Sequence, residues 1–122
     1  MLNFFRRLFR IEDNNFGVAR SSNWPRLRKE HLLKYPFCVL TGTTKKLNVH
    51  HILPVWLFPE EEENPDNFIT LSGDKIYGVN PHQWFGHLGN FKLYNPNVRE
   101  DVLIWAEKLR STALTNSLKK VK

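Results

Sequence analysis

Four of the five histidines in this 122-residue chain fall in two short stretches, VHHILPV at 49–55 and NPHQWFGHLGNF at 80–91. Neutral imidazoles can fill gaps in a core, but they can also bind a metal ion or move a proton. Adjacent residues on an extended strand point to opposite faces, so His50 and His51 must serve different neighbours. Three imidazoles around an open coordination position make a catalytic metal site, and a fourth makes a general base. Together with Asn67 in PDNFITL, this is the inventory that a metal-dependent phosphodiesterase needs.

The stretches RLRKEHLLKYPFCVLTG, LNVHHILPV, NPDNFITL and HQWFGHLGNF follow one another in an order that resembles the HNH family of endonucleases. The resemblance covers roughly residues 24 to 95. It implies that His50 is the first-strand metal ligand and His51 the general base. It also implies that Asn67 is a catalytic residue that ties down the loop or orients the base, and that His82 is the metal ligand on the helix.

His87 is the further candidate ligand, but its spacing from His82 raises a geometric question. In an α-helix, residues five apart diverge by roughly 140° at the usual ~100° per residue. Gly86 offers a place where the helix could break and let His87 swing back to the metal. The alternative is that His87 contacts a phosphate or a backbone carbonyl.

The resemblance implies one divalent metal ion, and Mg, Mn, Zn and Ni all stay open. Imidazole ligands suit Zn, Ni or Mn better than Mg, which prefers oxygen. Many HNH proteins also hold a structural zinc with two cysteine pairs, whereas Cys38 is the only cysteine of this chain. We therefore expect no structural zinc. We expect apolar packing in its place, by Phe37, Val39, Trp84 and Phe85.

The elements that must position these residues follow from turn and helix signals. FCVL at 37–40 and LNVHHILPV at 47–55 indicate a β-hairpin whose turn contains Gly42. SSNWPRLRKEHLLKYP predicts a helix with Pro25 near its start and Pro36 closing it. NPNVREDVLIWAEKLRS predicts a second helix, with Asn97 as N-cap. Its core-facing residues are Val98, Val102, Trp105, Ala106 and Leu109.

We therefore expect an α+β fold: a small ββα-metal (His-Me finger) core, in which a β-hairpin is followed by a helix, flanked by additional helices. The domain spans residues 24–111. Before it, residues 1–23 form an amphipathic and basic segment, whose apolar side suits docking on the core or on a partner better than membrane binding. After it, residues 112–122 form a basic tail.

The charge of the chain favours a polyanionic partner. Eighteen basic residues against twelve acidic ones give a net charge of +6 and a pI near 9.7. The acidic residues concentrate at 60–66, which we expect to be a loop facing away from DNA. His31 reads as a surface residue. The residues predicted to bind nucleic acid are Arg20, Arg26, Arg28, Lys29 and Lys92.

These features predict a metal-dependent DNA endonuclease that nicks one strand or cleaves both. The alternative is a module with an HNH fold that binds DNA or assembles without cleaving, within a larger phage packaging or recombination complex. No apolar run approaches the ~20 residues of a membrane span, and the N-terminus lacks the features of a secretory signal. A lone cysteine suits a reducing compartment. We therefore expect a cytoplasmic protein, for example one encoded by a phage and made in its bacterial host.

Overall fold

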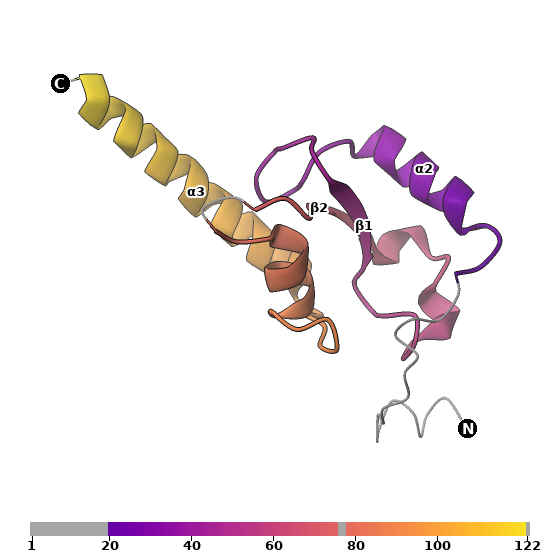
Figure 1. Ribbon diagram of the computed structural model, residues 1–122. Coiled ribbons are helices and arrows are strands. Elements are labelled where there is room, and N and C mark those ends of the chain that lie inside the picture. The colour runs from indigo at the N-terminus through magenta and orange to yellow at the C-terminus, as the bar shows by residue number, and fades with distance from the viewer. Residues whose placement is uncertain (1–19, 76–77, 122) are drawn as a thin grey trace.

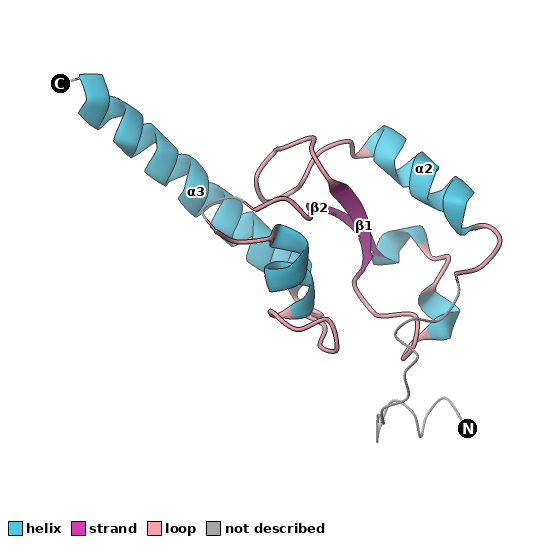
Figure 2. Cartoon of the chain, viewed as in Figure 1, coloured by secondary structure: helices cyan, strands magenta, loops and turns pink. Residues whose placement is uncertain are grey.

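The computed structural model describes residues 20–75 and 78–121 of the chain. A short helix, α2 (Trp24–Lys34), precedes a two-stranded antiparallel sheet of β1 (Leu47–His51) and β2 (Phe68–Ser72). A one-turn π-helix, η4 (His82–Gly86), and a long helix, α3 (Val98–Val121), follow the sheet (Figures 1 and 2). This arrangement confirms the predicted α+β class with a hairpin followed by helices.

The hairpin pairs different segments from those predicted. β1 pairs with β2 in a register that places His50 opposite Ile69 and His51 opposite Phe68, so the expected strand at 37–40 is wrong. The segment forms a closed turn instead, because the Cys38 N–H donates to the Thr43 carbonyl and the Gly42 N–H donates to the Cys38 carbonyl. The turn expected at Gly42 is present, with a positive φ of 76° that glycine adopts readily.

The core lies between the hairpin, the turn around Cys38 and the start of α3. Val39 and Phe85 are partly buried against it, as the expected apolar clasp requires. Phe37 and Trp84 are not part of the clasp, because 48% and 54% of their surfaces are exposed. The closed turn explains why Phe37 is exposed: it buries the side chain of Cys38 and leaves that of the preceding residue at the surface. The buried members of the core are Cys38, Leu40, Ile52, Ile69, Leu71, Val98 and Val102.

Helix α2 lies beside the hairpin and confirms its predicted start and end. Pro25 occupies the first turn, where a missing N–H costs nothing, and the chain leaves the helix at Tyr35 before Pro36. Trp24 packs edge-on against Phe68 of β2, with ring centroids 5.4 Å apart. His31, expected at the surface, is half-buried, and its ring lies 5.8 Å from that of Phe68.

Helix α3 begins at Val98, as predicted, and runs to Val121, beyond the expected end at 111. Its first turns pack on the core, and the helix then extends away from the hairpin (Figure 1). Near its start, the Arg99 guanidinium donates to the backbone carbonyls of Asp66 and Phe68. Among residues 20–75 and 78–121, no helix combines the length and the apolar character that crossing a membrane requires.

Candidate metal centre

The two adjacent histidines of β1 serve different sides of the strand, as the alternation of an extended backbone requires. The ring of His50 faces η4, where the centroids of the His82 and His87 rings lie 4.9 and 4.7 Å away. The ring of His51 faces α2 and lies 4.5 Å from that of Trp24.

His50, His82 and His87 form a group that could hold one metal ion, with one ligand nitrogen from each residue and all three nitrogens within 4.8 Å of one another. The Nε2 atom of His82 lies 3.1 Å from Nδ1 of His50 and 3.2 Å from Nε2 of His87. Imidazole nitrogens about 2.0–2.1 Å from a tetrahedral ion would be roughly 3.3 Å apart, and at right angles about 2.9 Å apart. These two separations fall between those values, and the third pair of nitrogens, from His50 and His87, lies within 4.8 Å, so the group could hold an ion.

The π-helix explains how His87 joins the group despite its five-residue spacing from His82. Hydrogen bonds of the i→i+5 type widen the turn, so residues five apart come to the same side. The divergence of roughly 140° expected from α-helical geometry therefore does not apply. Gly86 lies within the widened turn and does not break it.

Gly86 also lets η4 approach β1 closely. A Cβ atom built on Gly86 would lie 2.9 Å from Cε1, 3.0 Å from Nε2 and 3.1 Å from Nδ1 of His50. Real Cβ atoms essentially never show contacts under 3.0 Å. The absence of a side chain at this position therefore allows the backbone of η4 to lie on the His50 ring.

Hydrogen bonds around the group leave lone pairs for a cation. The Nδ1 of His87 lies 2.9 Å from the Leu93 carbonyl. Because a carbonyl only accepts, Nδ1 carries the proton and Nε2 presents its lone pair toward His82. In His50, Nδ1 is the nitrogen that faces His82, whereas Nε2 is buried and has no hydrogen-bond partner among the described residues.

Burial keeps all three imidazoles neutral, which is the form that binds metals. Desolvation places the pKa of His50 well below its ordinary 6.5, and the neighbouring histidines lower it further. Burial, followed by the charge of His87, lowers the pKa of His82 to about 4. The pKa of His87 is also lowered by burial, although its bond to Leu93 opposes the shift.

His51 is held with one defined nitrogen available. Its Nε2 lies 2.9 Å from the Glu62 backbone carbonyl, so Nε2 carries the proton and Nδ1 is left with the lone pair. The ring contacts those of Trp24 and Phe68, with centroids 4.5 and 5.2 Å away. Burial lowers the pKa of His51, and the bond to the Glu62 carbonyl works against that shift. A neutral imidazole in this orientation can accept a proton.

Asn67 is buried, and its side chain holds the loop that follows β1 in place. Its Oδ1 accepts from the Leu53 N–H at 2.8 Å, and its Nδ2 donates to the carbonyls of Leu53 and Glu61 at 3.0 and 3.3 Å. The Glu61 carbonyl immediately precedes Glu62, whose carbonyl fixes the His51 ring. The structure thus links Asn67 to the orientation of His51 through one peptide unit.

A cavity of about 430 Å³ brings together five of the predicted site residues, but not Asn67. The histidines at 50, 51, 82 and 87 line it, and Arg20 contributes the one cationic side chain among its lining residues. The Arg20 guanidinium carbon lies 5.7 Å from the Trp24 ring centroid.

Other residues predicted to bind nucleic acid do not line this cavity. Arg26 pairs with Glu30 on the exposed side of α2 at 3.0 Å, and Arg28 donates to the Leu47 carbonyl at 3.3 Å. Lys29 and Lys92 are exposed.

Two features of the site escaped the sequence analysis. Glu62 contributes a backbone carbonyl, which no side-chain pattern reveals. Asn95 holds the far end of η4: its N–H donates to the Gly86 carbonyl at 3.1 Å and its Nδ2 to the Phe85 carbonyl at 3.0 Å. Asn95 precedes Pro96 in the stretch YNPN, which is typical of a turn, and this was the indication in the sequence that Asn95 has a structural role. Comparisons of the chain with protein-family models, with curated proteins and with solved structures found no match.

Proposed function

We propose that this protein is a metal-dependent DNA endonuclease that hydrolyses phosphodiester bonds, as its resemblance to the HNH family implies. One observation carries the proposal: a three-histidine group and a fourth histidine with a defined acceptor nitrogen line the same cavity. A structural metal site has no use for an additional base, whereas hydrolysis needs one to activate water.

In this proposal, His50, His82 and His87 hold a single divalent ion. When bound, the ion supplies positive charge that neutralises the scissile phosphate and stabilises the departing 3′-oxygen. The neutral state of the three rings, set by their burial, supports metal binding without a prior loss of protons.

His51 acts as the general base. Its Nδ1 takes a proton from the attacking water, and the Nε2–H bond to the Glu62 carbonyl keeps the ring in the orientation that this transfer needs. Asn67 is then a positioning residue, because it fastens the loop that carries the Glu62 carbonyl.

Arg20 is the residue placed best for the phosphate backbone, since it lines the cavity beside the histidines. Arg26, Arg28, Lys29 and Lys92 would then extend the contact outside the cavity. Contacts of this kind are electrostatic and position DNA without reading its sequence. We expect the log of the DNA affinity to fall with log salt by about 0.9 per phosphate neutralised. An affinity that is the same at low and moderate salt would argue against DNA as the partner.

A non-cleaving DNA-binding or assembly module, for example in a phage packaging or recombination complex, is the second candidate. Exposed Leu103, Ile104 and Trp105 on α3 favour it, since a partner could cover them. A plasmid nicking assay with and without EDTA separates the two candidates, because only the endonuclease would cleave and would stop when the metal is removed.

Substitutions of the adjacent histidines test the proposed roles. His50→Ala should weaken metal binding and cleavage together. His51→Ala should leave metal affinity, measured by calorimetry, near normal while the cleavage rate falls by roughly 10²–10⁴, the usual worth of general acid–base catalysis. His31→Phe is the matched control, because His31 lies outside the cavity. Equal losses of metal affinity in both alanine variants would make His51 a ligand and leave the mechanism without its base.

A further inference from the structure

The metal group is assembled from two parts of the chain, so its geometry depends on how these parts are held together. His50 belongs to β1, whereas His82 begins η4 and His87 directly follows it. The backbone of Gly86 lies directly on the His50 ring. A displacement of η4 relative to the hairpin would therefore change the distances among the three ligand nitrogens.

Asn80 connects η4 to the hairpin. Its Oδ1 accepts from the Gln83 N–H at 3.0 Å and its backbone carbonyl accepts from the Trp84 N–H at 2.9 Å. Pro81 already has helical φ and ψ, so Asn80 caps the turn, with proline in the first helical position. The other end of the same side chain, Nδ2, donates to the Gly73 carbonyl at the end of β2, at 3.0 Å.

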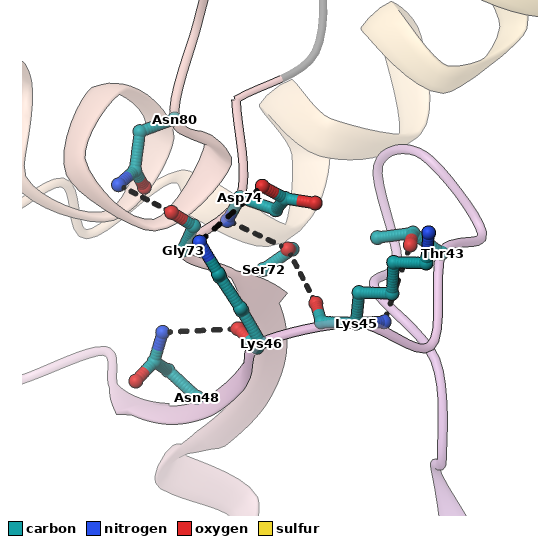
Figure 3. Close-up of polar contacts among 8 residues, drawn as sticks. All are labelled: Thr43, Lys45, Lys46, Asn48, Ser72, Gly73, Asp74 and Asn80. Atoms are coloured by element: carbon teal, nitrogen blue, oxygen red, sulfur yellow. Dashed lines mark hydrogen bonds and ion pairs between the residues drawn. The ribbon is translucent and has the colours of Figure 1, made fainter.

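Hydrogen bonds of Gly73 and its neighbours hold the Gly73 carbonyl in place. The Gly73 N–H donates to the Lys46 carbonyl at 2.8 Å, next to the start of β1. The Ser72 hydroxyl donates to the Lys45 carbonyl at 2.8 Å and accepts from the Asp74 N–H at 2.9 Å (Figure 3). The bond from Asn80 therefore connects η4 to a part of the hairpin that several hydrogen bonds hold in place.

We propose that Asn80 is a positioning residue for the three-histidine group. Its amide joins the end of β2 to the first turn of η4 and so sets the separation between His50 and His82. This inference rests on the proposed function in one respect, namely that the group binds a metal.

Asn80→Asp removes only the hydrogen bond from Asn80 to the Gly73 carbonyl. Aspartate caps a helix as well as asparagine does and keeps the oxygen for the Gln83 N–H, but a carboxylate has no N–H to donate to the Gly73 carbonyl. Asn80→Ser is the second variant, since serine retains a capping oxygen and is too short for the second bond. Asn90→Asp is the matched control: it makes the same charge change, and its side-chain oxygen still accepts from the Lys92 N–H.

Cobalt(II) is the probe, because calorimetry gives its affinity and its visible absorption reports the coordination geometry. We expect Asn80→Asp to stay folded, to bind Co²⁺ roughly 10–100-fold more weakly, and to change the absorption bands, as loss of a residue that orients ligands does. Asn90→Asp should match the wild type in both readouts. Wild-type affinity and spectrum in Asn80→Asp would overturn the proposal, as would unfolding of both Asn80 variants.

A metal-free readout separates the two proposals. In EDTA, the ring ¹⁵N resonances of His82 should shift in Asn80→Asp and stay in place in Asn90→Asp. A wild-type protein that binds no Co²⁺ would refute the metal centre while leaving this comparison intact. Unchanged His82 resonances in Asn80→Asp would refute the positioning role even where the metal centre stands.

Discussion

Replacing Gly86 with alanine should destabilise the protein, although the same change in most helices has the opposite effect. Gly86 has no positive φ, and alanine normally gains about 1 kcal/mol over glycine within a helix. Here the new methyl group would lie 2.9 Å from Cε1 of His50, so the ring must move by about 0.5 Å or more to reach ordinary carbon contact. The His50 ring is only 2% exposed and lies against the rings of His82 and His87, so it cannot shift without disturbing them. Overpacking of this kind costs typically ~1–3 kcal/mol, so we expect the free energy of unfolding to fall by about 1–2 kcal/mol.

Urea denaturation in EDTA measures this effect without a contribution from bound metal. A double-mutant cycle with His50→Ala isolates the contact, because removal of the ring makes room for the methyl group. In that background Gly86→Ala should cost nothing or stabilise by up to about 1 kcal/mol. The reasoning is refuted if Gly86→Ala stabilises the wild-type protein, or if its cost is the same with and without the His50 ring.

Three further outcomes are expected. His31→Phe should raise the free energy of unfolding by about 1 kcal/mol in urea denaturation, because the ring remains while a buried nitrogen without a partner is removed; a loss of stability would contradict this. In EDTA, stability should be complete above pH 6.5 and decline as the pH falls toward 4, because the unfolded chain takes up a proton at His82 before the folded one does. That decline amounts to at most about 3 kcal/mol from His82, and a urea profile equally steep in His82→Phe would exclude His82 as its source. Cys38→Ser should cost about 1 kcal/mol with no change in metal content by mass spectrometry, and release of a chelator-resistant zinc would show that a structural site was overlooked.

The four histidines that line the cavity could be singled out from the sequence because their chemistry is local. Two adjacent histidines on a strand necessarily diverge, and Pro25 and Asn97 mark helix starts whatever the rest of the chain does. The partner of β1 could not be predicted in this way. FCVL and FITL are both short apolar runs, and tertiary hydrogen bonds decide which of them pairs. The turn at Gly42 favours the wrong choice, since it closes on Cys38 and not on a neighbouring strand.

The geometry at His87 depended on a helix type that periodicity does not reveal. A reading at ~100° per residue assumes an α-helix, and only the i→i+5 bonding of η4 removes the conflict between His82 and His87. The exposure of Trp84 has the same origin: with both histidines turned toward His50, its side chain lies on the outer side of the turn.

The contacts along the outer side of β2 also bear on self-association. A two-stranded sheet leaves backbone carbonyls free to pair with a strand from another molecule, which is a route to aggregation. In β2, the carbonyl of Phe68 accepts from the Arg99 guanidinium and that of Thr70 from the Val39 N–H. A second hairpin cannot add at this edge without displacing both donors. Arg99, at the start of a helix that has no part in the cavity, thereby helps to close one edge of the sheet that carries His50 and His51.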